Sequence, residues 1–280
     1  MNVLGLSASC RRWGNTDILV HTALRGAAEE GAETRFLRIP DLELGPCVGC
    51  MACVFKDRDC VRKDRLPEFL EAMRWADAVV LGSPCYVLGA TAQIKNLHDR
   101  MIRFGIRREF VGKPGLALVA AGVPGWEPLA LAQVSLFFLF LGMPVVDQFI
   151  GHAQGPGEIF DDPAACDRAL EAGRALGRGE TAYRGDPGPC PVCHLDLVTT
   201  RPDGTAHCLL CDLPGTWEDR NGGRRFVPAP GAEPRWSDRS MQHHFSDRIL
   251  PSGPRFKARI REIRTRIEEF QEGGQPWKSA

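Results

Sequence analysis

Eight of the eleven cysteines in this 280-residue chain fall into two tight groups. The first group is Cys47, Cys50, Cys53 and Cys60, and the second is Cys190, Cys193, Cys208 and Cys211. Disulfides rarely persist in a reducing compartment, where clustered thiols usually bind metal. The N-terminal residues lack the basic region and cleavage site of a signal peptide. We therefore expect a cytoplasmic protein with two metal sites.

The first group follows the pattern C-x2-C-x2-C-x6-C, in which three thiols come from one short loop and the fourth returns after an excursion. Four thiolates at this spacing suit the soft iron atoms of a 4Fe–4S cluster. The same cysteines could instead bind zinc or remain free thiols. The spacing predicts a metal or redox site between residues 47 and 60, and a 4Fe–4S cluster is the favoured occupant.

The second group consists of two C-x2-C knuckles separated by 14 residues, close to the zinc-ribbon pattern. Between the knuckles, the turn Pro202-Asp203-Gly204 predicts a hairpin. A structural Zn²⁺ would fold a segment that is too small and polar to fold alone. The alternative is a rubredoxin-like iron, although His194 and Asp212 replace the glycines that usually follow rubredoxin knuckles.

A candidate phosphate site lies between the first expected strand and the first expected helix. Its residues are Ser7, Ser9, Arg11, Asn15 and Thr16. Hydroxyl groups, a guanidinium and the start of a helix all stabilise a bound phosphate. The alternative is an ordinary turn that Asn15 or Thr16 caps.

Two further loops carry aromatic side chains within rigid backbone, which suits a planar heterocycle. The first, residues 82–89, offers Ser83, Pro84, Cys85, Tyr86 and Gly89, and the second, residues 121–126, offers Gly122 and Trp126. The alternative for both aromatic residues is structural packing. In a parallel sheet, ligands bind beyond the C-terminal ends of the strands, where these loops are expected.

Short apolar runs alternate with longer helical patterns over residues 1–178, which is typical of a parallel sheet covered on both faces. The expected strands are 2–6, 34–39, 78–81, 115–121 and 145–150. The expected helices are 16–30, 66–76, 92–104, 129–141 and 164–176. This alternation predicts a doubly wound α/β fold of five parallel strands in the flavodoxin-like order 2-1-3-4-5.

Beyond this unit, glycine and proline become frequent and helical periodicity fades. We expect a zinc-ribbon-like module at residues 186–230, and an arm ending in a helix at residues 231–280. One face of that helix carries Phe256, Ile260, Ile263, Ile267 and Phe270, which favours association between subunits. Six acidic residues against four arginines over 186–230 argue against nucleic acid. The apolar stretch 129–143 is too short to span a membrane.

Together these motifs resemble the NAD(P)H-dependent FMN reductases, and among them the iron–sulfur flavoproteins. The likeness covers about residues 1–178. It rests on residues 7–16, the cysteines of 47–60, Ser83-Pro84-Cys85-Tyr86, and Ala92-Gln93-Ile94-Lys95 followed by Asp99-Arg100. The resemblance implies that Ser7, Ser9, Arg11, Asn15 and Thr16 hold the FMN phosphate, and that Pro84, Tyr86 and Gly89 flank the isoalloxazine ring.

The sequence therefore predicts a flavin-dependent oxidoreductase in which FMN exchanges electrons with the 4Fe–4S cluster, without an identifiable catalytic acid or base. Ferredoxin or NAD(P)H would donate electrons, a small molecule or protein would accept them, and the chain would form a homodimer or homotetramer. One alternative is a cluster-free NAD(P)H-dependent FMN, quinone or azo reductase. Another is a non-enzymatic binding protein that uses the zinc module on a flavodoxin-like scaffold.

Overall fold

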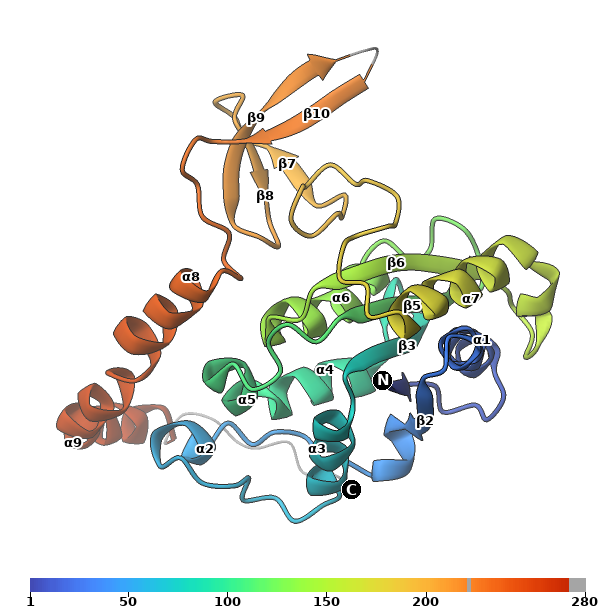
Figure 1. Cartoon of the computed structure of the whole chain (residues 1–280). Helices are drawn as coiled ribbons and strands as arrows, with labels where there is room; N and C mark the ends of the chain where they lie inside the picture. Colours follow the sequence, from blue (N-terminus) through green and yellow to red (C-terminus); the bar gives the residue numbers. More distant parts are fainter. Residues whose placement is uncertain (221–222, 272–280) are drawn as a thin grey trace.

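The main sheet has five parallel strands in the order β2-β1-β3-β5-β6, with the short β4 antiparallel to β3 (Figure 1). The structure is a computed structural model that describes residues 1–220 and 223–271. Its parallel strands are β1 (Asn2–Ser7), β2 (Glu33–Arg38), β3 (Ala78–Tyr86), β5 (Gly115–Ala121) and β6 (Val145–His152). This order confirms the predicted flavodoxin-like α/β fold.

Helices cover both faces of the sheet, which explains why its central strands are apolar throughout. One face carries α1 (Asn15–Glu29) and α7 (Pro163–Gly177), whose buried side chains share a core with β1, β3, β5 and β6. The other face carries α3 (Leu66–Trp75), α4 (Ala92–Arg100), α5 (Ile102–Arg107) and α6 (Ala130–Leu141). The short segments η1 (Ile39–Leu42), α2 (Ala52–Phe55) and η2 (Glu158–Asp161) lie in the connecting loops.

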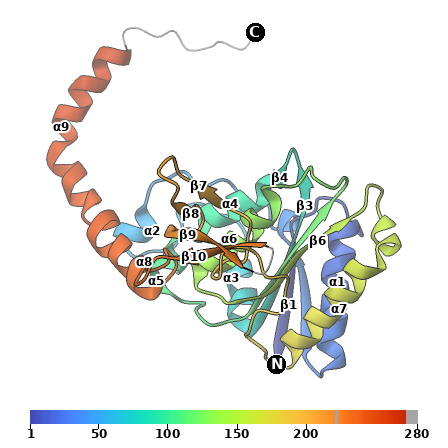
Figure 2. The same cartoon turned by 90° about the horizontal axis from the view of Figure 1, so that it is seen from above.

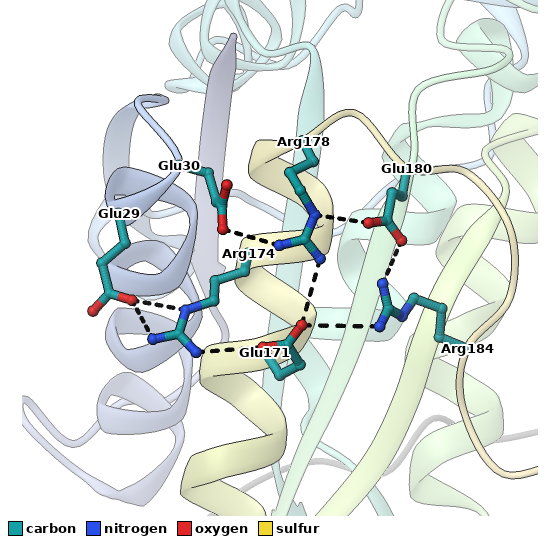
Figure 3. Close-up of polar contacts among 7 residues, drawn as sticks. All are labelled: Glu29, Glu30, Glu171, Arg174, Arg178, Glu180 and Arg184. Carbon is teal, nitrogen blue, oxygen red and sulfur yellow. Dashed lines mark hydrogen bonds and ion pairs between the residues drawn. The ribbon is translucent and has the colours of Figure 1, made fainter.

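Helices α1 and α7 approach each other closely through glycine. A Cβ atom at Gly173 would lie 1.9 Å from the carbonyl oxygen of Ala23, so no larger residue fits without moving the helices. Around this contact, arginines of α7 and of the loop after it form ion pairs with glutamates of α1, of α7 and of the residues that follow each helix (Figure 3). The two helices therefore pack as a pair beneath the sheet.

Two elements differ from the expected boundaries. Strand β3 continues to Tyr86 instead of ending at Leu81, because residues up to Pro84 pair with β5 and the last two pair with β4 (Gly89–Ala90). The expected helix 92–104 is broken at Met101 into α4 and α5. After the break, Gly105 packs against the ring of Phe140, where a side chain would not fit.

The second sheet is antiparallel, in the order β10-β9-β8-β7. Its strands are β7 (Val198–Thr200), β8 (Ala206–Cys208), β9 (Leu213–Arg220) and β10 (Gly223–Pro228). The core beneath it contains the second cysteine group and also Ala132 and Leu139 of α6. One side of α6 therefore packs on the main sheet, and another packs on this small sheet.

The chain then continues into α8 (Asp238–His243), η3 (His244–Ile249) and α9 (Ser252–Gln271). An ion pair between Arg108 and Asp238 ties α8 to the main unit. Helix α9 projects away from the rest of the molecule (Figure 2), and it leaves Phe256 and Ile267 about half exposed. The side chain of Phe270 lies outside the described residues, as do the last residues of the expected arm, 272–280. No helix within 1–220 and 223–271 is long and apolar enough to cross a membrane.

Candidate cofactor and metal sites

A cavity of about 270 Å³ opens at the C-terminal edge of the main sheet. The β1–α1 loop, the end of β3 and the loops after β5 and β6 enclose it. Eight of the twelve residues expected to contact the flavin line this cavity: Ser9, Arg11, Asn15, Thr16, Pro84, Cys85, Tyr86 and Gly122. Their contact with a flavin stays a prediction, but the structure brings these eight together.

The start of α1 fits a phosphate. Gly14 precedes the first turn of α1 and has no side chain that could cap the amides of that turn. These amides and the positive end of the helix dipole are therefore available to an anion. Buried Asp17 lies in the same turn, where it accepts hydrogen bonds from Ser7 Oγ (2.5 Å) and the Trp13 amide (2.9 Å). The Arg38 guanidinium, 3.4 Å from Asp17, offsets that negative charge beside the site.

The Asn15 side chain connects two loops. Its Nδ2 donates to the carbonyl oxygens of Ala153 (3.2 Å) and Gly155 (2.9 Å). Its Oδ1 accepts from the amides of Gly157 (2.9 Å) and Ile159 (3.3 Å). Asn15 thereby fixes the loop after β6 against the β1–α1 loop, and that loop supplies part of the cavity wall.

The remaining four expected contacts lie away from the cavity lining. Ser7 and Ser83 are fully buried and hydrogen-bond within the protein. Gly89 packs against the Gln133 side chain, and the Trp126 ring is 68% exposed. The sequence analysis missed five lining residues, Gly14, Ala120, Ala153, Gln154 and Pro156. The Gly155-Pro156-Gly157 turn after the last strand was a signal that could have indicated three of them.

Glu127 of the loop after β5 and His152 at the end of β6 form a carboxylate–imidazole pair outside the lining of this cavity, and the sequence analysis did not predict either. His152 Nε2 is 3.3 Å from Glu127 Oε1, which also accepts a hydrogen bond from the Gly125 amide. Nearby, Cys85 Sγ donates to the Trp126 carbonyl oxygen (3.4 Å). Burial, and then the charge of Glu127, raises the pKa of the Cys85 thiol, so this thiol stays protonated at neutral pH.

The second cysteine group is arranged for a single metal ion. The four sulfur atoms of Cys190, Cys193, Cys208 and Cys211 all lie within 4.8 Å of one another, and all four residues are buried. The Cys193 and Cys208 sulfur atoms are 3.8 Å apart. Tetrahedral coordination with metal–sulfur bonds of about 2.3 Å places neighbouring sulfurs about 3.8 Å apart, so the geometry fits a four-thiolate ion.

The first cysteine group lies on the loop between η1 and α3 and is more open. Cys47, Cys53 and Cys60 line one cavity of about 230 Å³, whereas Cys50 lines a neighbouring hollow against α9. Among the described residues, these four sulfur atoms do not lie close enough to one another to bind a single ion. A cluster separates its thiolate ligands more widely than one ion does. Burial, and then the neighbouring thiols, raises the pKa of Cys53.

Arginines of α4 and α5 hold this loop. The fully buried Arg100 guanidinium donates to Cys60 Sγ (3.4 Å) and to both carboxylate oxygens of Asp64 (2.6 and 3.0 Å). Arg103 pairs with Asp59 at 2.9 Å, and Arg107 pairs with Asp57. Each of these three guanidinium groups is paired with a carboxylate of the loop, so together they fix the position of the loop, and that of Arg100 also contacts a cysteine sulfur.

A groove of about 660 Å³ lies between the β1–α1 loop and the cysteine loop. Cys10 of the β1–α1 loop and Cys47 of the cysteine loop both line it, together with the start of α4. Gln93 on α4 donates a hydrogen bond to Cys10 Sγ at 3.3 Å. The cysteine loop therefore borders the same hollow as the β1–α1 loop.

Comparisons with known proteins agree with this geometry. A sequence profile of the NADPH-dependent FMN reductase family matches residues 1–155. An iron–sulfur flavoprotein of Methanocaldococcus jannaschii is 39% identical over 189 residues, which cover 64% of this chain and 94% of that protein. An iron–sulfur flavoprotein of Archaeoglobus fulgidus is 31% identical over 189 residues, covering 67% and 84% respectively.

Two other proteins resemble more of the chain. A flavone synthase of Aspergillus candidus is 28% identical over 256 residues, which cover 77% of each chain. The solved structure of a flavone reductase superposes with a TM-score of 0.81 at 20% identity, covering 100% of both chains. At that identity the superposition shows a shared fold, and this fold includes the second sheet and the C-terminal helices.

Proposed function

We propose that this chain, which belongs to the NADPH-dependent FMN reductase family and is a flavin-dependent oxidoreductase, couples FMN to a 4Fe–4S cluster. Cys47, Cys50, Cys53 and Cys60 would hold that cluster. The observation that carries this proposal is the groove lined by both Cys10 and Cys47. Cys10 lies between Ser9 and Arg11, which line the flavin cavity, so the groove supports a cysteine loop near enough to the flavin for short-range electron transfer.

The chain's own residues would bind and orient the two groups. The first-turn amides of α1, Ser9 and Arg11 would bind the FMN phosphate, while Pro84 and Tyr86 would contact the ring. The arginines of α4 and α5 would fix the cysteine loop. When bound, FMN supplies both one- and two-electron chemistry, which a cluster limited to one-electron steps cannot supply alone.

The same proposal covers the units, the metal and the partners. Residues 1–178 would form the FMN-binding domain, residues 186–230 a module held by structural Zn²⁺, and residues 231–280 the arm. Ferredoxin or NAD(P)H would supply electrons, and a small molecule or a protein would accept them. The exposed apolar face of α9 supports a homodimer or homotetramer.

Anaerobic purification tests the cofactor set directly. We expect about four iron atoms and about four acid-labile sulfides per chain in the cluster, with about one FMN and about one zinc. Cys53→Ser should lose the iron and sulfide and keep the FMN and zinc. The control Cys166→Ser, a half-buried thiol of α7, should keep all four. Flavin and zinc without sulfide in the unmodified protein would refute the cluster and leave the flavin site standing.

A second candidate function is the redox conversion of a flat aromatic ketone at the flavin. The observation that favours it is the likeness to a flavone synthase and a flavone reductase, which extends beyond the family domain. Anaerobic incubation of the holoprotein with flavone and NADPH, followed by chromatography, tests it. Loss of flavone with a stoichiometric loss of NADPH supports this function in the reducing direction, and unchanged flavone excludes that direction.

A further inference from the structure

Arg100, the last residue of α4, ties together the two ends of the loop that carries the first cysteine group. Its side chain is fully buried and lines the cavity of about 230 Å³ that three of the four cysteines share. Its Nη1 donates to the Gly45 carbonyl oxygen and to Asp64 Oδ2, both at 2.6 Å. Its Nη2 donates to Asp64 Oδ1 at 3.0 Å and to Cys60 Sγ at 3.4 Å. Because Gly45 precedes the four cysteines and Asp64 follows them, one guanidinium spans the whole loop.

These four hydrogen bonds use every N–H group of the two terminal nitrogens, since each of these nitrogens carries two. Three of the bonds go to groups that the backbone already fixes. Asp64 also accepts from the amides of Gly45 (3.1 Å) and Leu66 (3.2 Å), so its carboxylate has a fixed position. A guanidinium is a rigid planar fork, so fixing three of its N–H groups also fixes the direction of the fourth. The fold therefore holds one N–H of Arg100 on Cys60 Sγ.

This contact distinguishes Cys60 from the rest of its group. In the described part of the chain, Cys60 is the one member whose sulfur accepts a hydrogen bond from a charged side chain. The sulfur of Cys47 instead accepts from the Gly49 amide, at 3.5 Å. The Asp64 carboxylate offsets the charge of Arg100, so the sulfur is affected by a directed donor more than by a net positive charge.

A donor at a ligand sulfur favours the reduced form of an iron–sulfur cluster. Hydrogen bonds to the sulfurs are among the factors that set the reduction potential of a cluster. One added electron makes the sulfurs more negative, and an N–H group binds a more negative acceptor more strongly. Because an equilibrium shifts only by the difference in interaction free energy between its two states, the stronger bond in the reduced form raises the potential.

We propose that Arg100 is a positioning residue that raises the reduction potential of the cluster through its hydrogen bond to Cys60 Sγ. This inference rests on the proposed cluster at Cys47, Cys50, Cys53 and Cys60. In the reduction, one electron passes from an external one-electron donor to the cluster and the donor is oxidised. No proton is taken up and no covalent bond forms or breaks. An Arg100 with a structural role alone would hold the loop and leave the potential unchanged.

A charge-matched double variant tests this role. Arg100→Met with Asp64→Asn removes the donor together with its counter-charge, so the net charge beside the cluster stays the same. We expect the equilibrium constant for one-electron reduction to fall by about three- to tenfold, and tenfold corresponds to about 59 mV for one electron. Anaerobic titration of the FMN-loaded full-length protein with dithionite, followed by electron paramagnetic resonance, measures the potential. Iron and acid-labile sulfide are counted in the same samples.

A second arginine–carboxylate pair in the same cavity provides the control. Arg103 lies one turn further along the chain and pairs with Asp59 at 2.9 Å, and both line the cavity. Within residues 1–220 and 223–271, Arg103 donates to no cysteine sulfur. Arg103→Met with Asp59→Asn should therefore leave the potential unchanged. Equal shifts in the two double variants would show that support of the loop sets the potential, and they would overturn the proposal.

Arg100→Lys serves if the first double variant loses its cluster. Its ammonium group keeps a charge beside Asp64 but lacks the fork that reaches Cys60, so we expect a retained cluster with a lowered potential. An unchanged potential in whichever Arg100 variant retains the cluster would overturn this inference and leave the proposed function standing. Loss of the cluster from both Arg100 variants would also overturn it, because Arg100 would then act by holding the loop. Absence of acid-labile sulfide from the unmodified protein would refute the proposed cluster itself, and this inference with it.

Discussion

At the scale of single residues, His98 on α4 links folding to pH. Its ring lies 6.1 Å from Phe137, and its Nε2 is buried without a partner in the described residues. Burial, helped by the charge of Lys95, lowers the pKa of His98 to about 4. The folded protein therefore keeps this imidazole neutral under conditions in which the unfolded chain binds a proton.

The sign of the effect follows from this difference in protonation. Between pH 6.5 and pH 4 the unfolded chain binds more protons, so the free energy of unfolding falls as the pH falls through that window. When the pH is lowered from 7.5 to 5.0, we expect the free energy of unfolding of His98→Leu to fall by about 1–2 kcal/mol less than that of the unmodified protein.

Urea unfolding at the two pH values measures this shift. Ile94→Val, at a buried residue of the same helix that does not titrate, provides the control and should lower the free energy of unfolding equally at both pH values. If His98→Leu and Ile94→Val showed the same change between the two pH values, burial of His98 would not be the source of the acid sensitivity.

The site residues show what sequence can predict at this scale. Ser9, Arg11 and Tyr86 could be predicted, because residue type and a position after a strand together placed them at the cavity. Asn15 could be placed but not assigned its role, since its four hydrogen bonds go to a loop about 140 residues away. His152 was missed because the last strand extends two residues beyond its expected end.

At the scale of elements, the contact between α1 and α7 allows the contribution of close packing to stability to be compared with that of surface ion pairs. Alanine favours a helix more than glycine does by about 1 kcal/mol. At Gly173, however, the new Cβ would lie 1.9 Å from the Ala23 carbonyl oxygen, so the helices must separate. We expect Gly173→Ala to lower the free energy of unfolding by about 1–3 kcal/mol.

The ion pairs around that contact supply the comparison. Arg174 pairs with Glu29 at 2.6 Å and with Glu171 at 3.4 Å, and its side chain is about one third exposed (Figure 3). Exposed pairs contribute about 0–1 kcal/mol, so Arg174→Ala should cost less than Gly173→Ala in chemical unfolding. A variant Gly173→Ala as stable as the unmodified protein would show that the helices separate at no cost.

Whether an element boundary can be predicted from sequence depends on whether its cause is local in the chain. The strand and helix positions of the main unit could be predicted within a few residues, because apolar periodicity is local. The break at Met101 could not, and it lies between two tertiary contacts: the buried Arg100 reaches the cysteine loop, and Gly105 packs on Phe140. Similarly, β3 extends past Leu81 because β4 and β5 supply partners for it.

At the scale of the whole molecule, the two sheets share a helix. The sequence indicated that α6 was buried, because it is apolar on all sides, but not that two different cores bury it. Val134 and Phe138 belong to the main core, whereas Ala132 and Leu139 belong to the core beneath the second sheet. The module that carries the second cysteine group therefore covers part of the main unit.

One buried hydrogen-bond path joins the main sheet to the first knuckle. Gln148 of β6 donates from Nε2 to the Cys193 carbonyl oxygen at 2.8 Å, and its Oε1 accepts from Ser135 of α6 at 2.6 Å. Gln148 is 5% exposed, so this bond has no competing water. Loss of the knuckle would leave its amide group without one of its partners.

On the proposal that the second cysteine group holds a structural zinc, its removal should unfold one part of the molecule and weaken the other. Binding of a structural zinc contributes about 10–16 kcal/mol, more than so small a sheet can supply from its own core. For the double variant Cys193→Ser and Cys208→Ser, we expect the amides of β8 and β9 to lose protection from hydrogen exchange. The amides of β1 and β5 should stay protected, and the FMN content should not change. The melting temperature should fall, because Leu139 and Gln148 lose their cover. Full protection of β8 and β9 in the variant would mean that apolar packing on α6, without any metal, holds the second sheet in place.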